Sequence, residues 1–391
     1  MSVSFKINDF LTRKIHDNYS ILSAVASRLH RSESPPPDSL LEKWQIQKTG
    51  EHIFDNRFEA GVLGTNEIST RYSWGDAWAY RLRNVQLVGE AAHIFFQGGS
   101  LFNIDPLTQI IKKERTIRRP IRLLQRMQKG PLLHLCGPNS ENHGHFILDH
   151  LPRLLPFLER FHSTPSAQVL VSPGRKKWQA RYLAHFGIPE TRIIEANFGT
   201  IQVEELWYAP ILHTKENHAK LSSPTNHLAV KEALAVKPEY FINPLCIFAS
   251  RQDAPNKKIL NEERLARKAK EVFDDVRIIK LSEHSLDKQL HLFASASVII
   301  GAVGQNLTEV LCATGKLVLI MTVEEQINPN QRSWGRAYHN LALLGGNKSV
   351  LLTRDSTTDT NRNWSFNEDR FVHVLRKSWR LFQQGSNEIL T

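Results

Sequence analysis

Short apolar runs that alternate with helix-patterned segments constrain the fold of this chain more than any other feature. The apolar runs lie at 168–171, 245–249, 276–279, 298–300 and 316–321. Segments with helical spacing lie between them, at 177–186, 260–272 and 285–296. Short apolar strands separated by helices are typical of a parallel sheet that is covered on both faces. The sequence therefore predicts an α/β fold with two lobes.

Chain length and local composition predict how the fold is divided. A chain of 391 residues exceeds one ordinary core and indicates two domains. The prolines of 35–37 interrupt any helix, so 1–45 is predicted to be an appendage or linker. The predicted division then continues with an N-terminal domain with a β-rich entry at 46–235, a C-terminal α/β domain at 236–365 and a closing amphipathic helix at 366–391.

The charge balance bears on partners and location. Fifty Lys and Arg against 39 Asp and Glu give a formal net charge of +11, which favours polyanionic partners. The basic clusters at 112–119 and 175–177 are not interleaved with aromatic residues, so no nucleic-acid partner is expected. The three cysteines are far apart in the sequence, which fits a reducing compartment. Without a signal-like or membrane-spanning apolar run, we expect a cytoplasmic protein with possible peripheral attachment to the inner face of a membrane.

The first stretch with catalytic potential runs from Asn142 to Leu154. If this stretch is helical, His145 and Asp149 share one face, where the carboxylate can orient the imidazole and either group can take a proton. Arg153, one turn further on, could hold an anion or pair with Asp149. The alternative is a helix N-terminus with buried polar pairs. The neighbouring histidines also leave a metal site open, although no clear metal motif is present.

The second stretch follows the apolar run at 245–249 directly. Ligands bind at the carboxyl ends of parallel strands, so Arg251 and Lys258 could contact a diphosphate there. Asn261 and Glu262 open the next helix. Asn261 is interpreted as a helix cap and Glu262 as a first-turn charge that complements the helix dipole.

The third stretch follows the run at 298–300. Gly301 and Gly304 form a Gly-x-x-Gly turn, and Gln305 and Asn306 follow at the start of a predicted helix. Glycines let backbone amides approach a ligand, and a helix N-terminus favours an anion. The alternative is an ordinary tight β–α connection.

Together the three stretches resemble glycosyltransferase family 61, which includes bacterial capsular polysaccharide proteins, plant xylosyltransferases and animal EGF-domain O-GlcNAc transferases. The resemblance spans roughly 84–325. The matching residues are His145, Asp149, Leu151, Pro152, Arg153 and Leu154; Ser250, Arg251, Lys258, Asn261 and Glu262; and Gly301, Gly304, Leu307 and Thr308. The chain departs from the third motif, where Val303 replaces a histidine and Glu309 an asparagine, and Gln305 stands where a small residue is usual.

The resemblance implies two Rossmann-like domains of GT-B type, with the acceptor on the N-terminal domain and a nucleotide sugar on the C-terminal one. Inverting, metal-independent transfer of a hexosyl or pentosyl unit is expected, with a UDP-sugar as co-substrate and no cofactor. The acceptor would be a glycan or a lipid-linked glycan in surface polysaccharide assembly. Asp149 or His145 would be the base. Arg251, Lys258 and the amides of Gly304 to Asn306 would bind the diphosphate.

Two alternatives remain at this point. Val303 and Glu309 are compatible with a non-catalytic relative that acts as a scaffold or binds glycans. The histidines between 134 and 150 are compatible with a metal-dependent hydrolase.

Overall fold

The computed structural model describes residues 31–65, 70–89, 92–97, 100–102, 125–137, 139–196, 199–212, 223–323, 334–354 and 358–387. These residues form two compact units. One unit contains 31–49 and 75–212, and the other contains 50–74 and 223–387. Residues 1–30, which make up most of the predicted appendage at 1–45, lie outside the described residues.

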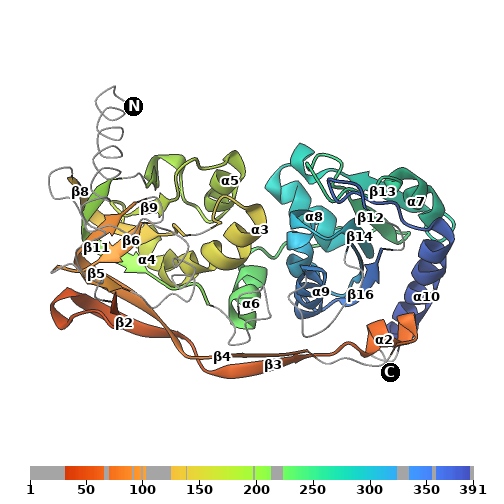
Figure 1. Ribbon diagram of the computed structural model, residues 1–391, viewed down its shortest axis with the longest axis horizontal. Coiled ribbons are helices and arrows are strands. Elements are labelled where there is room, and N and C mark those ends of the chain that lie inside the picture. Colours follow the sequence, from red (N-terminus) through yellow and green to blue (C-terminus); the bar gives the residue numbers. More distant parts are fainter. Residues whose placement is uncertain are drawn as a thin grey trace. The chain divides into compact units, whose positions relative to one another are not determined.

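The C-terminal unit is built on a five-stranded sheet (Figure 1). Its strands are β12 (Leu245–Ala249), β13 (Asp275–Ile279), β14 (Val298–Ala302), β15 (Leu317–Thr322) and β16 (Lys348–Thr353). They lie in the order β13-β12-β14-β15-β16, and every neighbouring pair is parallel. This is the 2-1-3-4-5 order of doubly wound folds, so the α/β fold predicted from the apolar runs is confirmed.

Helices cover both faces of this sheet. Figure 1 shows α8 (Leu286–Ser295) and α9 (Trp334–Leu344) on one side, and α7 (Glu262–Ala269) and α10 (Glu368–Asn387) on the other. α6 (Pro224–Ala233) packs against α9. The core on the α7 and α10 side joins strand residues such as Phe248 and Ile300 to Leu265 and Phe371. β12, β14 and β15 are buried along their whole length, which explains why their sequences are almost continuously apolar.

Residues 50–74 belong to the C-terminal unit, although they precede most of the N-terminal unit in the sequence. They form β3 (Gly50–Phe54), α2 (Arg57–Leu63) and β4 (Thr70–Trp74), and β3 pairs antiparallel with β4. The partition therefore differs from the predicted domain boundaries at 45 and 235. Apolar periodicity reports the element type and burial of a segment, and it does not identify the sheet against which the segment packs.

A buried ionic network attaches this segment to its unit. Glu59 of α2 is 6% exposed, and its carboxylate accepts a hydrogen bond from Arg336 of α9 at 2.7 Å and from the amide of Leu351 of β16 at 2.9 Å. His339 Nε2 lies 2.9 Å from Asn56 Oδ1. Each buried charge thus has an opposite charge or hydrogen-bond partners, which offsets the cost of removing it from water.

The N-terminal unit has a larger, mixed sheet. Its main strands are β5 (Ala77–Val88), β11 (Thr200–Tyr208), β8 (Gln125–His134), β9 (Gln168–Val171) and β10 (Ile193–Glu195). β8, β9, β10 and β11 are mutually parallel, whereas β5 runs antiparallel to β11. β6 (His93–Phe95), β7 (Leu101–Phe102), β1 (Arg31–Ser32) and β2 (Leu40–Gln47) extend the sheet beyond β5. The sheet is therefore rich in parallel pairs but carries an antiparallel half.

β2 shows that the predicted appendage at 1–45 ends too late. Its residues pair antiparallel with β5 from Leu40 onward, so the polyproline segment directly precedes a strand of the sheet. Between them lies only η1 (Pro37–Ser39), a single 3-10 turn. β2 alternates half-buried and exposed residues, and this period of two is the pattern of a strand with one solvated face.

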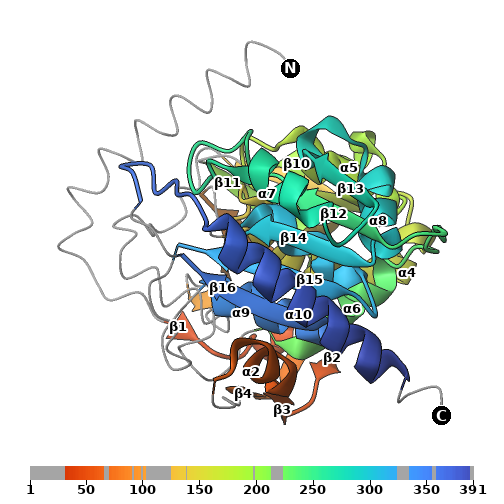
Figure 2. The same cartoon turned by 90° about the vertical axis from the view of Figure 1, so that its right-hand side faces the viewer.

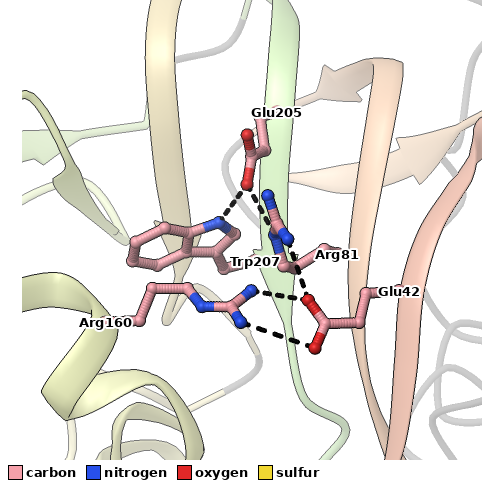
Figure 3. Close-up of polar contacts among 5 residues, drawn as sticks. All are labelled: Glu42, Arg81, Arg160, Glu205 and Trp207. Atoms are coloured by element: carbon pink, nitrogen blue, oxygen red, sulfur yellow. Dashed lines mark hydrogen bonds and ion pairs between the residues drawn. The ribbon is translucent and has the colours of Figure 1, made fainter. Parts of the chain in front are cut away.

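A charge network fastens β2 and α4 (Leu158–Ser163) to the sheet (Figure 3). Glu42 of β2 accepts hydrogen bonds from Arg81 of β5 at 2.8 Å and from Arg160 of α4 at 2.7 Å. Glu205 of β11 accepts from Arg81 at 2.8 Å and from Trp207 at 2.7 Å. The hydrogen bonds from Arg160 and Arg81 lower the pKa of Glu42 to about 2.

Candidate functional site

The first motif lies at the carboxyl end of β8. After a loop come a single helical turn α3 (His143–His145), one turn of π-helix η4 (Phe146–His150) and a 3-10 segment η5 (Leu151–Phe157). Asn142 is the N-cap, and its side chain accepts a hydrogen bond from the amide of His145 at 3.3 Å. The expected helix is therefore present but irregular. A π-turn within a helix is often found at functional sites.

His145 and Asp149 form a hydrogen-bonded pair. Nδ1 of His145 lies 2.6 Å from Oδ2 of Asp149, and the two side chains are 25% and 7% exposed. The shared face predicted from their spacing is thus observed. A buried carboxylate that binds Nδ1 of an imidazole fixes the orientation of the ring. The partly exposed ring of His145 keeps contact with solvent, as a group that exchanges a proton with a ligand must.

Arg153 has a different role from the one that its position in the motif suggested. Its side chain is 2% exposed and donates to the carbonyls of Ala209 at 2.6 Å and Cys136 at 2.7 Å. Its Nη2 lies 2.8 Å from Nδ1 of His134. These contacts use the guanidinium to join the loop after β8, the loop after β11 and η5. They give Arg153 a structural role, in place of the anion contact or the pair with Asp149 that were expected for it.

His134 and His143 have different contact partners. His134 is buried between Arg153 and the carbonyl of Ala92, which lies 2.8 Å from Nε2, and burial together with Arg153 lowers its pKa to about 3. His143 packs against the rings of Trp178 and Tyr182. In the part of the chain that the structure describes, no group of three or more His, Cys, Asp or Glu is placed to ligate a metal ion.

The second and third motifs meet at the point where the strand order of the C-terminal unit reverses. Arg251 follows β12, and Gly304 and Asn306 follow β14, which is the parallel neighbour of β12. Nη1 of Arg251 donates to Oδ1 of Asn306 at 3.3 Å, and Nδ2 of Asn306 donates to the carbonyl of Ala249 at 2.6 Å. Ligands of doubly wound sheets bind in the crevice outside this switch point.

The guanidinium of Arg251 is short of partners. Its Nε is buried without a hydrogen bond, and its other recorded bond is a long one of 3.4 Å from Nη2 to the carbonyl of Asn256. Within the described residues no carboxylate lies at ion-pair distance from it. Burial lowers the pKa of Arg251 from its ordinary value, against the raising effect of Tyr338 and Asp253. A partly buried cation with unused donors is stabilised by a bound anion.

The glycines of the third motif make room for these side chains. A Cβ atom on Gly304 would lie only 1.8 Å from Nη1 of Arg251. A Cβ atom on Gly301 would lie 3.0 Å from Leu307 and 3.1 Å from the carbonyl of Ala249. Gly304 therefore lets the guanidinium reach the end of β14, and Gly301 allows close packing inside the sheet.

The remaining predicted residues of the second motif support its backbone. Glu262 is buried and accepts from the hydroxyl of Ser250 at 2.6 Å, and its burial raises its pKa above the ordinary value. Asn261 lies at the N-cap position, but its side chain makes no capping bond. It exchanges two hydrogen bonds with the backbone of Phe366 instead, so the capping role predicted for Asn261 is wrong. Local sequence patterns cannot reveal a contact between residues that are 105 positions apart.

Two further residues were expected near the anion. Lys258 is half-buried, and its amide donates to Oδ1 of Asn363 at 2.9 Å. Gln305 is exposed at the first position of η8 (Gln305–Cys312), where backbone amides lack partners within the helix. Tyr338 of α9 was not expected from the sequence. Against the larger lowering by burial, Tyr338 raises the pKa of Arg251. No motif in the segment around Tyr338 indicates this, because only the fold brings the two residues together.

Comparison with known protein families finds a match to part of the chain. Residues 143–320 match the model of the family described as Glycosyltransferase 61, and this segment carries the three motifs from His143 onward. The match confirms the resemblance to glycosyltransferase family 61 over this segment of the chain. The family supports a glycosyltransferase function in general. A search of curated proteins finds no match.

Proposed function

We propose that the chain transfers a hexosyl or pentosyl unit from a nucleotide sugar, with UDP as the expected nucleotide, to a glycan or lipid-linked glycan in surface or capsular polysaccharide biosynthesis. The observation that carries the proposal is the partly buried Arg251 guanidinium, which lacks a carboxylate partner at the switch point of a doubly wound sheet. A diphosphate supplies the missing negative charge. Its oxygens also match the fork of donors on an arginine.

The leaving diphosphate is stabilised by fixed positive charge in this proposal. Arg251 and Lys258 supply cations, and the first amides of η8, from Gly304 to Asn306, supply aligned N–H groups. Charge that develops on the diphosphate as the sugar leaves is thereby neutralised by the protein, without a metal ion.

The acceptor hydroxyl is activated by His145 with Asp149. With Nδ1–H donated to Asp149, the lone pair lies on Nε2, which takes the proton of the hydroxyl as it attacks the anomeric carbon. Asp149 stabilises the imidazolium that results. Attack in line with the departing diphosphate inverts the anomeric centre. The proposed setting is the cytoplasm, with the protein held peripherally at a membrane.

The test is thermal stability of the protein with a panel of nucleoside diphosphates and their sugars, with and without EDTA. A ligand that binds only the folded state adds about 2.7 kcal/mol of stability at a hundredfold excess over its dissociation constant. We expect one nucleotide to raise the melting temperature, and we expect EDTA not to remove the shift. Absence of a shift with every nucleotide would contradict the donor assignment.

Gly304→Ala sharpens this test. The added methyl displaces the guanidinium, so we expect nucleotide affinity to fall about tenfold, while Arg251→Ala lowers it further. In the Arg251→Ala background, Gly304→Ala should have no additional effect, because both act through one side chain. Additive losses would show that Gly304 does not act through Arg251.

The second candidate function is a non-catalytic relative that binds glycans. It is motivated by Val303, which replaces the histidine of the family motif and is 2% exposed beside β15, where its amide donates to the carbonyl of Met321 at 2.8 Å. The discriminating variant is Val303→His. Sugar transfer by the variant alone would favour this candidate, and transfer by the unmodified protein would exclude it.

A further inference from the structure

We propose that the C-terminal unit carries a second anion site, a groove between α7 and α10 that takes the phosphate-bearing headgroup of an anionic membrane lipid. The groove has a volume of about 460 Å³. Its lining residues are Lys268, Glu271, Asp369, Val372, His373, Arg376, Lys377 and Arg380. This site is distinct from the one at Arg251 and does not depend on the donor assignment.

The groove carries a net positive charge, which favours an anionic ligand. Four lysine and arginine side chains line it against two carboxylates. Glu271 is shared by Lys268 at 3.0 Å and Arg376 at 2.7 Å, so one carboxylate serves two cations. Within the described part of the chain, Lys377 and Arg380 have no ion-pair partner. The groove therefore has an excess of positive charge that is concentrated on α10.

The size and lining of the groove fit a small charged group. Ligand pockets usually measure about 300–1,000 Å³ and are mostly apolar. This groove falls within that range of volume, but Val372 is its single apolar lining residue. It therefore suits a phosphate with its polar substituent better than an apolar molecule. Arginine forks bind phosphate oxygens in pairs, and lysine adds a point charge.

The groove and the Arg251 site lie toward opposite ends of α7. Glu262, the first residue of α7, binds Ser250 beside Arg251. Lys268 comes six residues later, about 9 Å along a helix that rises 1.5 Å per residue. The two sites can therefore be tested separately.

The outer face of α10 favours a lipid surface over a free ligand. Exposed residues recur at helical spacing along it, at Asp369, His373, Arg376 and Arg380, so the two arginines of the groove lie on the solvent side of α10. Figure 2 shows α10 running across the outside of the unit in front of the sheet. No described helix is long and apolar enough to cross a bilayer. Basic side chains on the solvent side of a helix are suited to the plane of headgroups.

The test is binding of the full chain to phosphatidylcholine vesicles with and without phosphatidylserine. The variant is Lys377→Ala with Arg380→Ala, and the matched control is Lys237→Ala with Lys288→Ala, two exposed lysines of the same unit outside the groove. A basic residue near an anionic surface contributes about fivefold to partitioning, so we expect a loss of about thirtyfold in the variant and a much smaller loss in the control. High salt should remove the difference.

Three results would overturn the proposal. They are equal binding by the variant and the unmodified protein, binding that does not require phosphatidylserine, and equal losses in the variant and the control. Stabilisation by inorganic phosphate that depends on Lys377 and Arg380, without vesicle binding, would assign the groove to a soluble phosphate instead. Nucleotide binding by the same variants should be unchanged, which separates this site from the donor site.

Discussion

Arg153 and Arg251 both belong to family motifs, yet their surroundings are opposite. Arg153, in the N-terminal unit, is buried and donates to two carbonyls, with a neutral histidine beside it. Arg251, in the C-terminal unit, has two long hydrogen bonds and a buried Nε without a partner. A guanidinium with its donors used holds a fold together. A guanidinium with unused donors is available to a ligand.

The two arginines also differ in the hydrogen-bond acceptors around them. The partners of Arg153 are backbone carbonyls and an imidazole, which the fold supplies permanently. Around Arg251 the fold supplies the amide oxygen of Asn306 and the carbonyl of Asn256, and Gly304 lets the guanidinium pack directly against the backbone. A cation with unused donors at the carboxyl ends of parallel strands is the feature on which the proposed diphosphate site rests.

The largest effect is expected for Arg153→Ala. This change leaves buried acceptors at Ala209, Cys136 and His134 without a donor, at about 1–3 kcal/mol for each. We expect the free energy of unfolding in urea to fall by about 3–5 kcal/mol. Arg181→Ala, at an exposed position of α5 (Lys177–His185), is the control and should change it by less than about 0.5 kcal/mol. A small loss for Arg153→Ala would remove the contrast between the two arginines.

Arg251→Ala should show the reverse pattern. Hydrogen bonds to charged groups contribute about 1.5–3 kcal/mol each, so we expect nucleoside diphosphate affinity to fall about a hundredfold. The free energy of unfolding should stay within about 0.5 kcal/mol of its value, because no strong partner is lost. Calorimetric titration and urea unfolding of the same sample measure both quantities. A large loss of stability with unchanged affinity would make Arg251 structural like Arg153.

The pH dependence of stability should report the environment of Arg153 through His134. Burial lowers the folded-state pKa of His134 to about 3, against an unfolded value of about 6.5. The neutral ring therefore stabilises the fold above pH 6.5, and this contribution is lost as the pH falls towards 3. By pH 5 the loss is about 2 kcal/mol. Urea unfolding across this range should give a shallower decline for His134→Gln than for the unmodified protein. Equal slopes would contradict the assignment.

The smallest effect is expected for Glu42→Gln in the network of Figure 3. The folded-state pKa of Glu42 is about 2, so its stabilising contribution is present above the unfolded pKa of about 4.5 and is lost as the pH falls through 2. Its side chain is 39% exposed, and solvent screening limits the contribution to about 1 kcal/mol. Thermal melts at neutral and acidic pH should show a small difference that disappears in acid. A loss as large as that of Arg153→Ala would show that exposure does not separate the two sites.

Much of the C-terminal sheet could be predicted from sequence because its central strands are buried on both faces. The apolar runs at 245–249 and 298–300 fall on β12 and β14, which are buried along their whole length. The spacing of His145 and Asp149 likewise predicted their contact, since a local period determines it.

Other features depend on contacts between distant segments. Asn261 was interpreted as a cap because cap residues are recognised locally, whereas its partner Phe366 is 105 positions away. The hydrogen bonds of Arg153 could not be predicted either. Two of its acceptors are backbone carbonyls, and only the folded chain brings them close to the guanidinium. The strand at 40–47 was missed because the prolines at 35–37 suggested a linker, and the predicted appendage was extended to residue 45.

The placement of residues 50–74 in the C-terminal unit has a consequence for synthesis of the chain. Glu59 and its partner Arg336 are 277 positions apart. At about 5–20 residues per second, roughly 14 to 55 seconds pass between translation of the acid and translation of the base. During that interval the α2 segment has no native partner on α9 or β16. The α2 segment therefore waits for its own unit, which can be completed only after α9 and β16 have emerged from the ribosome. A fragment that starts after residue 213 would bury Arg336 without its carboxylate.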